Sequence, residues 1–538
     1  MYIYSTTSRL KHERINHMLI WFAIMESSEP PQGSYMALYL GLAAVVLAVL
    51  HQLLQYKPDP REPPVIYPRI PYVGHAIGML LRGKRYIRTL DERYGYGIYT
   101  LPIMCWKMYI VTSPPMASAL NRVPKNLSFR PIQVGLVERV GSLPQQTDKI
   151  NKTNLMDEEG QGIMGAIHDV MYSMLPSGPP LEKLTQAVLD HVAENLQQLP
   201  HDKMEVGLYD LCKVIMGRST VSALYGKGTP LDHPSFIPDY WDFDDGLLGI
   251  LLSPFPSITH SKPYSAREHM AHLLLKYFAG GHDQKASEMM RSRFEMYRKH
   301  GYCTDGLART ELSFIVGAVS NSTITAFWFL AHILSDASLV ADLRAETAAA
   351  VARDGDRCVV DDAFLRSATA CPLLNSVFRE TLRLTSTTTG SRQVLADTMV
   401  DDRYLLKKGA FVSVEGSVLH YKDAFWGADA AVFKARRFCK SLTGTSADGR
   451  KIHPAAWRAF GGGDVLCPGR NLALNEILGM AVPILMSFDV KGVDGGVVET
   501  PPVKDEVMPV GVLRPSRDVC VRFSTRSGWG NVKWEYRA

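Results

Sequence analysis

A glycine-rich stretch that ends in a cysteine constrains this chain more than any other part of its sequence. Residues 460–469 read Phe-Gly-Gly-Gly-Asp-Val-Leu-Cys-Pro-Gly, and an apolar, helix-like run follows over residues 470–488. Consecutive glycines adopt backbone angles closed to other residues and let a planar group approach the main chain. Cys467 lies at the start of the predicted helix, where unpaired N–H groups and the helix dipole favour a thiolate over a thiol. The alternative is a buried structural cysteine after a flexible turn.

Two charged motifs precede this stretch. Glu380 and Arg383 are three positions apart, so in a helix both side chains project from one face and can form an ion pair. On its own, such a pair is a common helix feature that contributes a few tenths of a kcal/mol. The next basic partner is Arg437, which precedes Phe438 in a segment between predicted helices.

The glycine-rich stretch resembles the haem loop, F-x-x-G-x-x-x-C-x-G, of the cytochrome P450 family of haem-thiolate enzymes. The matching residues are Phe460, Gly463, Cys467 and Gly469. The E-x-x-R pair and the segment around Arg437 are similar to two more elements of that family, in the same order. Of the family's P-E-R-F segment, only the Arg and the final Phe are present. The resemblance implies that Glu380, Arg383 and Arg437 lock the chain behind the haem.

The resemblance also implies a fold and a cofactor. The fold is the cytochrome P450 fold, which is mainly α with a small β region, preceded here by one N-terminal transmembrane helix. The cofactor is heme b, iron protoporphyrin IX, with Cys467 as the ligand of the iron. The resemblance covers most of the chain, about residues 35–530. The 538-residue chain has 46% hydrophobic and 21% charged residues, which is ordinary for a globular protein.

Two departures from the family concern the haem propionates. Val465 stands where the family usually has Arg or His beside a propionate, and no W-x-x-x-R helix is visible before residue 200. The propionates still need donors. We expect Arg392 and Arg458 to supply them, with His168 as a third candidate; a surface or core position is the alternative for each.

Charge and cysteine usage exclude several classes of protein. The net charge of +5 is dispersed along the chain, which argues against nucleic acid as a partner. Eight cysteines without a C-x-x-C pair argue against a zinc site or a disulfide scaffold and indicate a reducing compartment. The resemblance implies an acidic electron donor, NADPH-cytochrome P450 reductase. Candidate docking residues near the cysteine are Lys434, Arg436, Lys440, Arg450, Lys451 and Arg458.

The N-terminal region predicts a membrane anchor. We expect four parts: an N-terminal segment (1–34), a transmembrane anchor (35–54), a proline-rich hinge (55–72) and the haem-thiolate catalytic domain (73–538). The anchor has the roughly 20 apolar residues that span a bilayer; a buried core helix is the alternative. Basic residues balance on its two sides, so charge leaves the orientation open. If translation starts at Met25, the basic residues before the anchor are absent and the balance of charge no longer leaves the orientation open. The chain would then be a single-pass protein of the endoplasmic reticulum membrane, with its catalytic domain cytoplasmic.

The middle of the chain alternates between predicted strands and helices. Residues 95–101 and 108–112 form a predicted strand pair, and residues 180–226 and 265–302 have helical periodicity. Between these helical regions, residues 230–261 are rich in proline and aromatic residues. We interpret them as a lid over the substrate entrance that touches the membrane; a plain surface loop is the alternative.

A long apolar helix over residues 310–335 carries a polar patch. Helix-interior polar residues either bond back to a carbonyl or serve a site. In the commonest family pattern an acid and an alcohol here relay protons, but this chain lacks the acid. Its pattern is similar to the branch that holds sterol 7α-hydroxylases, prostacyclin synthase and many fungal biosynthetic oxygenases. Aligned on that branch, Asn321 and Ser322 take the acid and alcohol positions, with Thr323 next, and together they can hold a water chain.

These patterns predict a membrane-anchored monooxygenase that oxidises an apolar small molecule from fungal secondary metabolism, such as a terpenoid or polyketide, with sterols as the next substrate class. One alternative is a haem-thiolate isomerase or dehydratase of the same fold, which the missing acid supports. Another is a haem-binding or sterol-carrying protein without catalysis. Turnover that depends on NADPH distinguishes the monooxygenase from the isomerase or dehydratase. Oxygen consumption distinguishes the monooxygenase from the binding protein without catalysis.

Overall fold

The structure is a computed structural model that describes residues 38–46, 49, 58–104, 106–199, 204–387, 389–441, 451–504 and 511–537. The chain divides into two compact units, Met1–Pro58 and Asp59–Ala538. In the first unit, residues 38–46 are helical and exposed. The predicted anchor (35–54) lies partly outside the described residues, and the predicted segment 1–34 lies wholly outside them.

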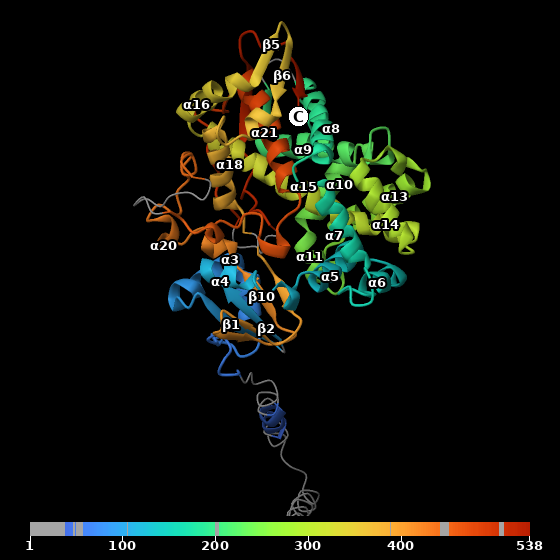
Figure 1. Ribbon diagram of the computed structural model, residues 1–538, viewed down its shortest axis with the longest axis vertical. Helices are drawn as coiled ribbons and strands as arrows, with labels where there is room; N and C mark the ends of the chain where they lie inside the picture. Colours follow the sequence, from blue (N-terminus) through green and yellow to red (C-terminus); the bar gives the residue numbers. More distant parts are fainter. Residues whose placement is uncertain are drawn as a thin grey trace, which may run out of the picture. The chain divides into compact units, whose positions relative to one another are not determined.

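The second unit contains a five-stranded sheet built from distant parts of the chain. Its order is β1 (Ile98–Ile103), β2 (Trp106–Val111), β10 (Phe411–Val414), β7 (Arg392–Val394) and β3 (Leu127–Ser128). β1 and β2 are antiparallel with Ile98 opposite Val111, so the predicted strand pair is confirmed. Figure 1 shows β1, β2 and β10 together with α3 (Gly74–Tyr94) and α4 (Pro114–Leu120). The N–H of Ile66 donates to the carbonyl of Thr100, so part of the predicted hinge packs on this sheet.

Three smaller sheets complete the β structure of the described residues. One contains β11 (Phe488–Gly492), β12 (Cys520–Thr525) and β4 (Met204–Gly207); the second contains β13 (Lys533–Arg537), β6 (Arg357–Asp361) and β5 (Val351–Asp354); the third pairs β8 (Thr398–Val400) with β9 (Tyr404–Leu406).

Helices make up most of the second unit, so the predicted mainly α class is confirmed (Figure 1). The further helices are α5 (Arg130–Gly141), α6 (Gln145–Lys152), α7 (Ile163–Met174), α8 (Pro179–Gln197), α9 (Leu208–Tyr225), α10 (Phe236–Asp245), α11 (Leu247–Leu252), α12 (Pro256–Thr259), α13 (Ser261–Ala279), α14 (Glu288–Lys299), α15 (Thr304–Leu334), α16 (Ala337–Thr347), α17 (Asp362–Arg366), α18 (Pro372–Thr385), α19 (Gly416–Leu419), α20 (Asp423–Trp426) and α21 (Arg470–Ser487).

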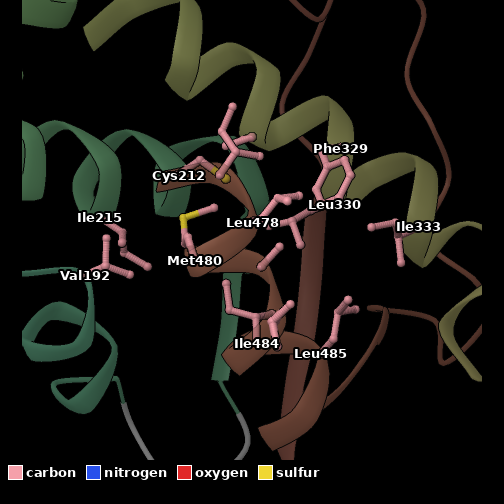
Figure 2. Close-up of a cluster of buried hydrophobic side chains, with 14 of the residues drawn as sticks. Val192, Cys212, Ile215, Phe329, Leu330, Ile333, Leu478, Met480, Ile484 and Leu485 are labelled. Carbon is pink, nitrogen blue, oxygen red and sulfur yellow. The ribbon is translucent and has the colours of Figure 1, made fainter. Parts of the chain in front are cut away.

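The predicted long helix is α15, and it runs through the centre of the core. It begins at Thr304, six residues earlier than predicted, because the sulfur of Cys303 accepts the N–H of Gly306 and caps the helix. Phe329 and Leu330 of α15 pack with side chains of α9 and α21 (Figure 2). A helix that is apolar nearly all round is stable only when other elements cover it.

Burial also explains the hydropathy of α15. Among the described residues it is the one helix long and apolar enough to cross a membrane, but 78% of its most apolar stretch is buried inside the protein. It is therefore the central core helix of this unit.

The predicted lid, residues 230–261, is largely helical. It forms a short 3-10 helix (Pro230–Asp232), α10, α11 and α12. Pro230 and Pro256 begin the 3-10 helix and α12, and a proline is tolerated at a helix start because its missing N–H would have no helical partner there. Trp241 and Phe243 are buried in the core. Phe255 and Ile258 are exposed, Ile258 to 80%, so the segment has both a packed side and an apolar outer side.

A buried ion cluster fastens α18 to the chain that follows α20. Arg383 donates to both oxygens of Glu380, at 2.7 and 2.8 Å, and Arg437 donates to the same carboxylate at 3.0 Å. These side chains are almost fully buried. Arg383 also donates to the carbonyls of His420 and Ala430, both at 2.6 Å. One carboxylate thus orders two arginines, which in turn hold the backbone leading to the cysteine loop.

Replacing Glu380 by Ala should lower the free energy of unfolding by about 3–5 kcal/mol, because two buried guanidinium groups lose their anion. Urea unfolding of the detergent-solubilised protein, followed by circular dichroism, measures this loss. The control is Glu535→Ala. Glu535 also accepts two hydrogen bonds from one arginine, Arg357, at 2.9 and 2.7 Å, but both side chains are exposed, so its loss should matter far less. Equal losses in the two variants would contradict a special role for the buried cluster.

Candidate functional site

Two of the three consecutive glycines in the cysteine loop have backbone angles that favour glycine. Gly461 has φ +77° and Gly463 has φ +66°. A Cβ atom would lie 2.6 Å from the carbonyl oxygen of Val465 at the first position and 2.3 Å from Oδ1 of Asn121 at the second. Gly462 is extended, but a Cβ there would lie 2.9 Å from Nη2 of Arg458. Neighbouring atoms therefore lie too close to all three glycines for a side chain to fit without a shift, and two of the three have a left-handed backbone.

Cys467 lies three residues before α21, and its N–H donates to the carbonyl of Phe460 at 2.9 Å. The residue is exposed at the edge of the loop, although protein atoms surround much of it. Burial raises the pKa of the Cys467 thiol, whereas the N–H groups of Gly469 and Arg470 and the Arg470 guanidinium oppose this rise. The predicted stabilisation of a thiolate by the helix start is therefore present, but it works against desolvation.

Sequence reasoning missed a contact between the loop and α7. The hydroxyl of Tyr172 donates to the carbonyl of Leu466, the residue before the cysteine. His168 stacks on the Tyr172 ring, with ring centroids 4.2 Å apart. His168 itself is exposed and contacts Asp169, which does not favour it as a buried donor. The one signal in the sequence was the spacing of His168 and Tyr172, which are four residues apart, although no helix was predicted there.

The structure brings the two predicted arginine donors to the same loop. Arg392 donates to Asp464 at 2.7 Å and to the carbonyl of Gly462 at 2.9 Å. Both arginines are buried, so Arg458 is not a surface docking charge as the sequence also allowed. Within the described residues, Nη1 of Arg392 and Nε and Nη2 of Arg458 are buried without a hydrogen-bond partner. Such unpaired cationic groups fit an anion bound beside the loop.

A buried histidine connects this loop to the end of α18. His420 has Nδ1 3.0 Å from the carbonyl of Ser386 and Nε2 2.9 Å from the backbone nitrogen of Arg458. Nε2 accepts the Arg458 N–H, so the proton is on Nδ1. Burial and the nearby Arg383 charge lower the pKa of His420 to about 3, so the imidazole stays neutral. His420 thus fixes the backbone of Arg458, one of the arginines predicted to donate to a propionate.

One face of α15 is open in the middle of an otherwise buried helix. Phe314, Gly317, Ala318 and Asn321 are at least partly exposed, at the three- and four-residue spacing of a single helix face. Gly317 is exposed, and a Cβ built on it would meet nothing within 4 Å. Apart from Asn321 this face is apolar, so it can line a binding pocket for an apolar molecule.

The three predicted relay residues of α15 make different contacts. Oδ1 of Asn321 accepts the N–H of Val512 at 3.1 Å, which joins α15 to the segment that precedes β12. Ser322 bonds back to the carbonyl of Ala318 at 3.3 Å. Among the described residues, the buried hydroxyl of Thr323 has no hydrogen-bond partner. Successive helix residues point about 100° apart, so the three side chains do not form one group.

Ser322 also contacts a buried acid that sequence reasoning missed. Glu476 of α21 is fully buried and accepts a hydrogen bond from Thr220 of α9 at 3.1 Å. Burial raises the pKa of Glu476 to about 7, and the contacts with Ser322 and Thr220 oppose that rise. The signal in the sequence was a single acid within an apolar helical run.

Proteins similar to this chain belong to one family. A family model described as "Cytochrome P450" matches residues 260–521 of this chain. A cytochrome P450 monooxygenase of Gibberella zeae is 32% identical over 515 residues, which cover 92% of this chain and 95% of the relative. Cytochrome P450 7B1 of Mus musculus is 23% identical over 501 residues, covering 90% and 95%. The solved structure of retinoic acid bound cyanobacterial CYP120A1 has the same fold, with a TM-score of 0.64 at 18% identity, covering 86% of this chain and 99% of that one.

The likeness to the Gibberella zeae enzyme extends over nearly the whole of both chains and includes the cysteine loop and the E-x-x-R helix. On this evidence the chain belongs to the cytochrome P450 family of haem-dependent monooxygenases.

Proposed function

We propose that this enzyme is a membrane-anchored monooxygenase that oxidises an apolar small molecule in fungal secondary metabolism, with electrons from NADPH through NADPH-cytochrome P450 reductase. The observation that carries the proposal is the cysteine loop: it exposes Cys467, and two buried arginines that contact the loop have N–H groups without a partner among the described residues. That arrangement suits a flat, iron-containing group with carboxylate substituents.

The residues of the loop fit haem. When bound, haem supplies the chemistry that activates dioxygen for the oxidation. Cys467 would bind the iron through its sulfur. Arg392 through Nη1 and Arg458 through Nε and Nη2 would hold the propionates, since these atoms are buried and unpaired in the described part of the chain. Asp464 neutralises part of the Arg392 charge, so Arg458 is the stronger anion donor of the two.

The open face of α15 supports an apolar substrate. Phe314, Gly317 and Ala318 would pack against the substrate and exclude water, and the amide of Asn321 would be the polar contact on that face. A terpenoid or polyketide suits such an apolar face and is the substrate class that we propose. A sterol, which is also largely apolar, is the second candidate.

Proton supply would run from the core through α15. Glu476 holds a proton near neutral pH and contacts Ser322, and the free hydroxyl of Thr323 is the next residue along the helix. Asn321 cannot ionise, so it would orient water with its amide rather than carry the proton. This route gives the three predicted residues separate tasks.

The exposed side of the lid supports contact with lipid. Leu252, Phe255 and Ile258 of the α11–α12 region are exposed apolar side chains, and clustered groups of this kind mark interaction surfaces. With the predicted anchor at 35–54, they would hold the catalytic unit against the endoplasmic reticulum membrane, on its cytoplasmic side. An apolar substrate could then enter from the bilayer.

An isomerase or dehydratase of the same fold is the second candidate, because Asn321 stands where the commonest family pattern has an acid. Such an enzyme would turn over without reductant. Product formation that requires NADPH and reductase therefore supports the monooxygenase, and product formation without them supports the isomerase.

Replacing Cys467 by Ala should abolish the red-shifted Soret band of the reduced, carbon monoxide-treated protein, because that band requires a thiolate ligand. The measurement is an absorption spectrum of the detergent-solubilised protein. The control is Cys520→Ala, since Cys520 is another exposed cysteine but lies in β12. A wild-type protein that folds but gives no haem spectrum would refute the proposed function.

Replacing Glu476 by Gln should remove a pH dependence of stability. Burial raises the pKa of Glu476 from 4.5 to about 7 in the folded state, so its contribution is complete below pH 4.5 and is lost as the pH rises through 7. Relative to the variant, the wild-type free energy of unfolding should fall by about 1.4 kcal/mol per pH unit between pH 4.5 and about 7, and should level off above pH 7. Urea unfolding at a series of pH values measures it. Glu182→Gln, at an exposed position of α8, is the control; parallel curves for Glu476→Gln and wild type would contradict the buried titration.

A further inference from the structure

A hydrogen bond from α7 reaches the peptide group that carries the cysteine. The Tyr172 hydroxyl donates to the carbonyl of Leu466. The nitrogen of the same peptide belongs to Cys467, and its N–H donates to the carbonyl of Phe460 at 2.9 Å. Because a peptide group is planar, bonds at both of its ends fix its orientation and the position of the Cys467 Cα atom.

The tyrosine is on a well-supported element. The first turns of α7 are buried, with Ile163 exposed to only 1% and Ile167 to 8%. The ring of His168 lies over the Tyr172 ring at 4.2 Å and 22°, which restricts the ring and with it the hydroxyl. The donor is therefore held in place before any ligand binds.

The contact is specific to the residues around the cysteine. The side chain of Arg470, the first residue of α21, donates to the carbonyl of Cys467 at 3.1 Å. Apart from Arg470, Tyr172 is the one side chain among the described residues that hydrogen-bonds to residues 465–469 from another element. Nδ2 of Asn471, just after that segment, donates to the carbonyl of Leu175 at the end of α7, at 3.5 Å. α7 thus contacts the chain on both sides of Cys467.

We propose that Tyr172 is a positioning residue for the cysteine ligand: its hydroxyl holds the peptide between Leu466 and Cys467 so that the sulfur stays beside the N–H groups of Gly469 and Arg470. N–H groups at the start of a helix favour an anionic sulfur over a thiol. Without the hydroxyl, the peptide can rotate and carry the sulfur away from them. The inference rests on the proposed role of Cys467 as the iron ligand.

The test is Tyr172→Phe, which removes one oxygen atom and keeps the ring that stacks on His168. The reduced, carbon monoxide-treated protein is held at raised temperature, and the decay of the red-shifted Soret band is followed with time. We expect decay about fivefold faster than in wild type, the factor for loss of one hydrogen bond. Haem content and the unfolding midpoint, measured in parallel, should stay at wild-type values.

The matched control is Tyr277→Phe. Tyr277 is a buried tyrosine whose hydroxyl also donates to a backbone carbonyl, that of Tyr225 at 2.9 Å, but it lies in α13. Faster decay in Tyr172→Phe alone supports the proposal. Decay at the wild-type rate, or equal acceleration in both variants, overturns it while leaving Cys467 as the ligand. Absence of the red-shifted band from wild type itself overturns the ligand assignment and this inference together.

Discussion

The carboxylate of Glu380 is the interaction on which the rest of the site depends. A buried anion is costly unless cations and hydrogen bonds surround it, and here it accepts from Arg383 and Arg437 within 3.0 Å. The arginines are equally costly without it. This mutual dependence keeps both arginines in place, and a remaining nitrogen of Arg383 then donates to the carbonyls of His420 and Ala430. The order of a whole segment follows from one ion cluster.

From that cluster, hydrogen bonds continue to the cysteine loop. His420, whose carbonyl binds Arg383, uses its ring to bridge Ser386 and the backbone of Arg458. A protonated imidazole could not accept the Arg458 N–H, so the lowered pKa of His420, about 3, keeps the bridge intact near neutral pH. The guanidinium of Arg458 then lies against Gly462 of the loop. The backbone position of Arg458 is thus set by a neutral histidine.

The features that could be predicted from the sequence are those with a fixed local spacing. The pairing of Glu380 with Arg383 depends on one helical turn, and the cysteine loop on ten consecutive residues. The strand pair and the long helix were visible as periodic patterns. Tyr172 and Glu476 were missed because their importance arises from contacts with Leu466 and Thr220, hundreds of residues away along the chain. No local pattern encodes which distant element will pack beside them.

Around Asn321, helix geometry gives adjacent residues different contacts. The sequence treats 321–323 as one polar group, but three neighbours on a helix face three directions. Asn321 accepts a hydrogen bond from the backbone of Val512, Ser322 contacts the buried Glu476 of α21, and the Thr323 hydroxyl has no partner among the described residues. α15 thus has a partly exposed, mainly apolar face and, on another side, a contact with a buried acid. Under the proposed function, these two sides would separate the exclusion of water around the substrate from the supply of protons.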